Sequence, residues 1–131
     1  MEVTRQYHFS AGHRLESAAF SPEDNARIYG QCYRQHGHNY LVEVTVGGQP
    51  DAVTGMAADL GALDAAVKRL ILERVDHYDL SSSVPSLAGV TTTGENLARA
   101  FWEWIEPALP GGSLRRVAVV ETDNNTFEYR G

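Results

Sequence analysis

The sequence predicts a single α+β domain with the element order ββααββ, and three observations support this class. Two segments of alternating apolar and polar residues come first, as in strands. Two segments with helical apolar spacing follow, and a second pair of alternating segments ends the chain. A chain of 131 residues is large enough for one core and too small for two, so residues 1–131 are expected to form one domain.

The first pair of strands is expected at residues 3–15 and 40–46. In the second of these, Tyr40, Val42, Val44 and Val46 alternate with more polar residues, which is typical of a half-buried strand. Residues 16–35 between the strands are expected to form a long irregular connection, and connections of that length are more often functional than filler.

The two helices follow this hairpin. Asp59 is a plausible N-cap for a helix with an apolar stripe at Leu60, Leu63, Val67, Leu70, Ile71 and Val75. Thr92 and Glu95 have the spacing of a capping box. The second helix would then bury Leu97, Ala98, Phe101, Trp104 and Ile105.

Residues 114–121 and 126–130 are expected to be the last two strands, joined by a tight turn at 123–125. So small a domain cannot cover every strand edge, and we therefore expect exposed edges to pair between subunits of an oligomer.

Composition excludes several functions. A formal net charge of −6 argues against a nucleic-acid platform. No apolar run approaches the roughly 20 residues that a membrane helix requires, and the N-terminus shows no secretory signal. The single cysteine cannot form an intramolecular disulfide. These features predict a soluble cytoplasmic protein.

Three histidines suggest a metal site. His36 and His38 share the parity of the apolar residues in the second strand, so both imidazoles project to one face. His13 shares the parity of the apolar residues in the first strand and can face the same cavity if the strands pair. A catalytic zinc has about three protein ligands and an open position. The pattern therefore predicts a Zn²⁺ site of the open, catalytic kind.

Four other residues have both a functional and a structural interpretation. Cys32 is either a buried small side chain or, beside Arg34, a thiolate that acts as nucleophile or base. Asp76 and His77 are either ordinary residues at a helix end or a carboxylate that orients a proton-transferring imidazole. Glu121 has inward parity, and it binds either a ligand with adjacent N–H groups or a partner across a subunit interface.

Several spaced motifs together resemble the 6-pyruvoyltetrahydropterin synthase family, which includes the bacterial 6-carboxytetrahydropterin synthases of queuosine biosynthesis. The resemblance covers essentially the whole chain. It rests on residues 9–13 (FSAGH), Cys32 with residues 36–40 (HGHNY), residues 54–56 (TGM), 76–77 (DH), 93–98 (TGENLA) and 121–123 (ETD).

The resemblance implies a tunnelling fold, in which ββααββ subunits form trimeric antiparallel barrels that stack into a homohexamer. It implies that His13, His36 and His38 bind zinc, and that Cys32, Asp76 and His77 form a catalytic triad. Glu121 would anchor the pterin, while Thr93 and Glu95 would lie near the pterin site. The implied substrate is 7,8-dihydroneopterin triphosphate.

Two branches of the family fit the residues. Three residues separate Cys32 from His36, which resembles the carboxy-forming branch, whose product is 6-carboxy-5,6,7,8-tetrahydropterin with release of triphosphate and acetaldehyde. Residues 21–30 and 121–125 resemble the pyruvoyl-forming branch of tetrahydrobiopterin-type synthesis. The spacing favours the carboxy-forming enzyme as our expectation.

Two different classes are also possible. Gly30, His36, His38 and Glu43 match the first half of a cupin metal motif, which would make Glu43 a ligand, although its strand parity is opposite to that of the histidines. Alternatively, zinc could brace the hairpin of a non-catalytic oligomer.

Overall fold

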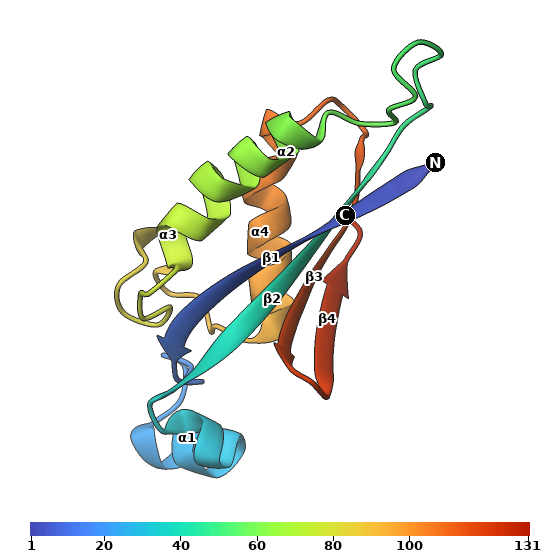
Figure 1. The fold of residues 1–131 in the computed structure, drawn as a ribbon. Coiled ribbons are helices and arrows are strands. Elements are labelled where there is room, and N and C mark those ends of the chain that lie inside the picture. The colour runs from blue at the N-terminus through green and yellow to red at the C-terminus, as the bar shows by residue number, and fades with distance from the viewer.

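The computed structural model describes residues 1–131 and confirms the α+β class. Four strands form one antiparallel sheet in the order β1-β2-β3-β4, and Figure 1 shows the long helices covering one of its faces. The strands are β1 (Glu2–His13), β2 (His36–Gly47), β3 (Leu114–Thr122) and β4 (Asn125–Tyr129). The first strand thus ends two residues earlier than its sequence pattern suggested.

Residues 16–35 do not form the irregular connection that we expected. They contain α1 (Pro22–Tyr29), followed by the 3₁₀ turn η1 (Gly30–Tyr33). The local cause is a helix start signal, because the Ser21 hydroxyl caps the Asp24 N–H at 3.1 Å and Pro22 occupies the first turn. In Figure 1, α1 lies beyond the ends of β1 and β2, away from the layer of long helices.

The first long helix begins where predicted, since Asp59 caps it by accepting a hydrogen bond from the Ala62 N–H at 3.0 Å. It runs as α2 (Leu60–Val67), a π-helical turn η2 (Lys68–Leu72) and α3 (Glu73–Val75). The second long helix is α4 (Gly94–Ile105). Short 3₁₀ turns lie at η3 (Pro85–Leu87) and η4 (Glu106–Ala108).

The expected capping box is wrong by one residue. Thr93, and not Thr92, is the N-cap of α4 and accepts from the Asn96 N–H. Thr92 is instead almost fully buried, and its backbone and hydroxyl oxygens face His13. The predicted exchange of hydrogen bonds between Thr92 and Glu95 is therefore absent.

The core lies between the sheet and the long helices. Phe9 of β1 stacks on Tyr40 of β2 with ring centroids 4.6 Å apart, and its ring meets Phe101 of α4 edge-on at 5.9 Å. Burying each such side chain contributes roughly 1.5–3 kcal/mol. This packing fixes the helix-facing side of β1 and β2, on which the three histidines also lie.

The edges of the sheet are β1 and β4. The segment after α3 covers the last part of the β1 edge, because the His77 N–H donates to the Ser10 carbonyl (2.7 Å) and the Leu80 N–H to the Gly12 carbonyl (2.8 Å). The Gly12 N–H in turn donates to the Tyr78 carbonyl at 3.1 Å. None of the helices combines the length and apolar character needed to cross a lipid bilayer.

Candidate metal centre and its surroundings

The register of β1 and β2 brings the three histidines together. His13 lies opposite His36, and Ala11 lies opposite His38, so the three imidazoles occupy adjacent positions on one face. The ring centroids are 4.6–5.0 Å apart, and one nitrogen from each ring lies within 4.8 Å of the others. The alternating parity of the two strands therefore predicted this cluster correctly.

Backbone carbonyls fix the orientation of two of the rings. His13 Nδ1 lies 3.0 Å from the Thr92 carbonyl oxygen, and His36 Nδ1 lies 2.7 Å from the Arg34 carbonyl oxygen. Because a carbonyl can only accept, each Nδ1 carries the proton and each Nε2 keeps a free lone pair. This is the arrangement usual for metal-binding histidines, whose other nitrogen is held by an outer partner.

The separation of the nitrogens also fits a zinc ion. His13 Nε2 and His38 Nε2 are 3.1 Å apart. Two nitrogens bound to one tetrahedral zinc at about 2.0–2.1 Å lie roughly 3.4 Å from each other, so only a small shift is needed. Metal binding would displace the proton that His38 Nε2 shares with His13.

Burial favours the neutral form of His13 and of His38. His13 is 1% exposed, and burial together with the neighbouring His36 lowers its pKa to about 4. Burial also lowers the pKa of His38, against the opposing effect of Glu121. Near neutral pH neither ring is a charged imidazolium, so metal binding has to displace only the proton shared between His38 Nε2 and His13 Nε2.

Two further polar groups border the cluster. Glu121, at the end of β3, places a carboxylate oxygen 3.8 Å from His38 Nε2, and both side chains are 16% exposed. The Tyr40 hydroxyl is 3.5 Å from His13, and burial, followed by the charge of Glu121, raises its pKa. Tyr40 therefore stays a neutral phenol. The inward parity predicted for Glu121 is confirmed.

Asp76 and His77 directly follow α3 and lie against β1. The Asp76 carboxylate accepts a hydrogen bond from the Ser10 N–H (2.9 Å), and His77 Nδ1 lies 2.9 Å from the same carboxylate. His77 adopts a left-handed backbone with φ of 64°, which is unusual for a residue with a Cβ atom. Its imidazole lies against the Asp76 carboxylate and is 82% exposed, which leaves the ring open to solvent.

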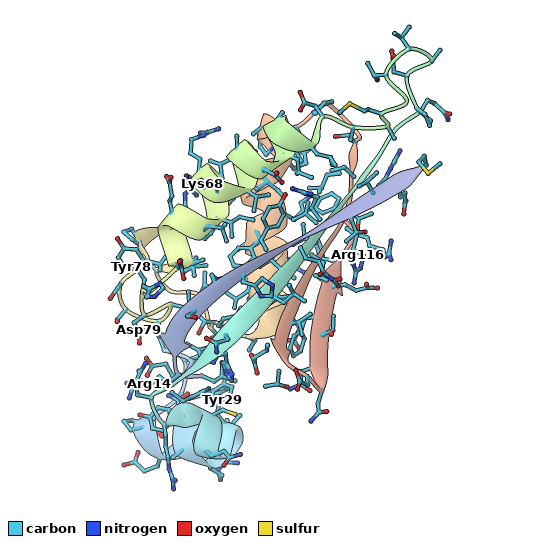
Figure 2. All side chains as sticks on the ribbon, in the orientation of Figure 1. Arg14, Tyr29, Lys68, Tyr78, Asp79 and Arg116 are labelled. Atoms are coloured by element: carbon cyan, nitrogen blue, oxygen red, sulfur yellow. The ribbon has the colours of Figure 1, made fainter.

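A shallow depression of about 400 Å³ lies beside His77 at the end of β1 and β2. Its lining includes His38 and Asn39 from β2, Ser10 from β1, and His77. Figure 2 shows Tyr78 and Asp79, which follow His77, at the same end of the sheet as Arg14. Ser10 and Asn39 have the parity opposite to that of the three histidines, and neither His13 nor His36 lines this depression, so within one chain His77 is not joined to the histidine cluster.

Three other predicted site residues, Cys32, Thr93 and Glu95, form no direct contact with the three-histidine cluster. Cys32 lies half-buried in η1, and its thiol forms no hydrogen bond within the chain. Thr93 acts as a helix cap, and Glu95 is exposed in the first turn of α4. The cupin alternative loses its expected ligand, since Glu43 pairs with Arg116 and Gln6 at the opposite parity.

Sequence reasoning missed the role of two residues near the cluster. Tyr40 was interpreted only as an apolar strand residue, although its parity places its hydroxyl beside His13. Thr92 was interpreted as a helix cap, and nothing in its local sequence indicates contact with a residue 79 positions away. The first could have been inferred from parity, whereas the second depends on tertiary packing.

Comparisons with known proteins agree with this geometry. The family model described as 6-pyruvoyl tetrahydropterin synthase matches residues 2–131. A human 6-pyruvoyl tetrahydrobiopterin synthase is 42% identical over 99% of this chain and 91% of its own length. A Caenorhabditis elegans 6-pyruvoyl tetrahydropterin synthase structure is 33% identical and superposes with a TM-score of 0.95, covering 100% of this chain and 95% of its own.

The carboxy-forming enzymes are more distant relatives. The 6-carboxy-5,6,7,8-tetrahydropterin synthase of Aquifex aeolicus is 29% identical over 98% of this chain and 97% of its own length. Similarity over the whole chain thus favours the pyruvoyl-forming branch, in contrast to the expectation drawn from the Cys32–His36 spacing, which is a single feature of one loop. The chain belongs to the 6-pyruvoyl tetrahydropterin synthase family of pterin lyases.

Proposed function

We propose that this protein is a zinc-dependent 6-pyruvoyltetrahydropterin synthase that eliminates triphosphate from 7,8-dihydroneopterin triphosphate. The observation that carries the chemistry is the cluster of His13, His36 and His38, because one nitrogen from each ring lies within 4.8 Å of the others. The higher identity to pyruvoyl-forming relatives supports the choice of product.

The three histidines would hold zinc through their Nε2 atoms, and a bound zinc ion supplies Lewis-acid polarisation of the side-chain hydroxyls of the substrate. The neutral state of His13 and the carbonyl contacts of His13 and His36 support this assignment.

Proton transfer is assigned to Cys32 and His77. Cys32, as thiolate, would abstract a proton from the substrate side chain, and His77 would exchange protons with the same carbons. Asp76 would favour the tautomer of His77 that carries its proton on Nδ1, because Nδ1 lies 2.9 Å from the carboxylate, and Nε2 would then be the exchanging atom. Loss of triphosphate and tautomerisation then reduce the pterin ring internally, so the reaction needs no nicotinamide.

Glu121 would bind the pterin through its amino and ring N–H groups. Its carboxylate is 16% exposed, and His38 is its one ion-pairing neighbour within the chain. A largely desolvated acceptor of this kind gains most from a ligand with two adjacent donors. We assign Thr93 and Glu95 to the edge of the same pocket, since Thr93 follows Thr92, whose carbonyl contacts His13.

Assembly would complete the site. The open β1 and β4 edges support pairing between subunits into the trimeric barrels of a homohexamer. A partner could then supply contacts for Cys32, whose thiol forms no hydrogen bond within its own chain. Sedimentation velocity on the purified protein tests this, and a stable monomer would contradict the proposal.

The deciding experiment is product analysis by mass spectrometry after incubation of zinc-loaded protein with 7,8-dihydroneopterin triphosphate. We expect 6-pyruvoyltetrahydropterin and triphosphate. The second candidate, the 6-carboxy product with acetaldehyde, is favoured by the Cys32–His36 spacing and would be recognised by acetaldehyde release. Unchanged substrate with a zinc-replete hexamer would indicate a binding protein instead.

Two variants test the residue roles separately. Cys32→Ala should retain zinc and assembly while kcat falls by roughly 10²–10⁴-fold, the usual contribution of a general base. Glu121→Ala should weaken pterin binding measured by isothermal titration, because two hydrogen bonds to a charged acceptor are lost. Full activity of the first variant, or unchanged affinity of the second, would refute the respective role.

A further inference from the structure

We propose that Arg14 and Tyr33 form a brace that positions the turn bearing Cys32. Its physical basis is a cation–π contact, in which the central carbon of the Arg14 guanidinium lies 4.9 Å from the centroid of the Tyr33 ring. Arg14 directly follows the metal ligand His13, and Tyr33 directly follows Cys32. Both are positioning residues, because they act on the reaction through Cys32, and the inference rests on the function proposed for that residue.

The turn that carries Cys32 is η1, and its backbone is tied to both strands that carry metal ligands. On one side, the Cys32 carbonyl accepts from the Leu15 N–H at 2.8 Å, on the segment that continues β1. On the other side, the Arg34 carbonyl oxygen lies 2.7 Å from Nδ1 of His36, the first residue of β2. The chain thus holds the thiol-bearing turn at the same end of the sheet as its own histidine cluster.

Arg14 is a fixed anchor for this turn. Its N–H donates to the Ser81 hydroxyl (3.0 Å), and the same hydroxyl donates to its carbonyl (3.1 Å). Its guanidinium also pairs with the Glu16 carboxylate at 2.9 Å. Because a guanidinium is planar, its edge can pair with a carboxylate while its face stacks on an aromatic ring. Glu16 therefore helps to hold Arg14 against Tyr33.

The contact is made by the face of the Tyr33 ring, since the Tyr33 hydroxyl forms no hydrogen bond within the chain. Arg14, Glu16 and Tyr33 all line a cavity of about 660 Å³, so one side of the brace is open and not packed by other side chains. Figure 2 shows Arg14 where the end of the sheet meets α1. With open space on one side, loss of the stacking should loosen the turn.

The brace would set where the Cys32 thiol lies relative to the metal cluster. An exposed cation–π contact corresponds to a roughly two- to fivefold change in an equilibrium constant, so its loss should raise the population of the open turn by that factor. A misplacement of about 1 Å can cost roughly 10²-fold in rate, and we expect a partial release to lower kcat by about three- to tenfold. KM and zinc content should change little, because neither depends on the thiol.

Alkylation of Cys32 tests the brace without turnover. The chain has one cysteine, so the mass increase after treatment with iodoacetamide reports on this thiol alone. In zinc-loaded protein without substrate, Tyr33→Leu and Arg14→Gln should each raise the alkylation rate roughly two- to fivefold. Tyr33→Phe should behave as the wild type in both alkylation and kcat, since it keeps the ring face that contacts Arg14.

Tyr29→Leu is the matched control. Tyr29 is the last residue of α1, three residues before Cys32, and it is half-buried like Tyr33, but no cation stacks on its ring. This variant should keep the wild-type alkylation rate and kcat. The double variant, which combines Arg14→Gln with Tyr33→Leu, should be no worse than either single variant, because both break the same contact.

Two outcomes would overturn the brace. In one, Tyr33→Leu matches Tyr29→Leu in both alkylation and kcat; in the other, the effects of the two single variants add in the double variant. If circular dichroism shows that Tyr33→Leu does not fold, Arg14→Gln carries the same prediction with the turn itself unchanged, and a wild-type alkylation rate there would refute the brace. Failure of the proposed function is distinguishable, since it would appear as retained turnover in Cys32→Ala, whereas the alkylation rates report on the brace alone.

Discussion

Two polar clusters lie on the same face of β1 and differ in how their groups are satisfied. Near the middle of the strand, Arg5 and Tyr7 of β1 contact Asp64 of α2. The Asp64 carboxylate accepts two hydrogen bonds from the Arg5 guanidinium (3.1 and 2.7 Å) and one from the Tyr7 hydroxyl (2.7 Å). At the end of the strand, the side-chain nitrogens of His13, His36 and His38 face one another, and the nearest carboxylate, that of Glu121, stays 3.8 Å from His38.

This difference separates a structural cluster from a binding site. In the first cluster the charges cancel, and the Arg5 and Tyr7 hydrogen bonds lower the pKa of Asp64. In the second cluster burial lowers the pKa of His13 and leaves lone pairs facing a common point. Polar groups that satisfy one another need no ligand, whereas converging lone pairs favour a cation.

The largest expected effect comes from His36→Ala, which removes one ligand and keeps the strand. Zinc affinity should fall by more than the roughly 10–100-fold seen for outer-shell partners, and turnover should fall with it. Zinc content after dialysis and activity are the measurements. Stoichiometric zinc with full turnover would show that the histidine cluster is not the metal site.

Acid should distinguish the clusters in the metal-free protein. The pKa of His13 is about 4 when folded and about 6.5 when unfolded, so between these values the unfolded chain binds more protons. The contribution of neutral His13 to the free energy of unfolding is thus fully present above about pH 6.5 and is lost as the pH falls toward 4. We expect the melting temperature to fall by several degrees over this range. His13→Gln should flatten this dependence, and an equally steep curve would contradict the assignment.

A smaller effect is expected from Thr92→Val, which deletes the hydroxyl 3.2 Å from His13 Nδ1 and keeps the carbonyl at 3.0 Å. The ring loses one of two restraints, so zinc affinity should fall by about tenfold or less. Competition with a chromogenic chelator measures this change. A loss as large as that of His36→Ala would mean that Thr92 affects folding of the site.

The smallest effect should follow Asp64→Asn. The Arg5–Asp64 pair is substantially exposed, and exposed ion pairs contribute little to stability. We expect unchanged zinc content and turnover, with a melting temperature within about 3 °C of wild type. Loss of zinc in this variant would show that the two clusters are coupled.

The sequence predicted most of the fold and the central part of the site, because both depend on local periodicity. Strand parity brought His13, His36 and His38 to one face, and Asp59 correctly marked the start of α2. Thr92 was misplaced because two adjacent threonines offer the same capping chemistry, and tertiary packing selects Thr93.

Contacts between loops could not be predicted in this way. The hydrogen bond of Gln35 to Asp79 depends on which loop packs beside Gly12, and neither residue has a periodic pattern that would reveal it. The position of Cys32 relative to Asp76 and His77 depends on loop packing of the same kind. Such features require coordinates, since sequence spacing does not determine them.

The segment after α3 also limits how a neighbouring strand can extend along β1. Because alternate residues of a strand direct their backbone groups to the same side, Ser10 and Gly12 share their outward groups with Glu2, Thr4, Gln6 and His8. Ser10 and Gly12 are already bonded to residues 76–80, so four positions are free for an incoming strand. The segment that carries His77 would therefore also act as a stop for any strand that pairs with the open edge of β1, and lengthening that incoming strand would not lengthen the pairing.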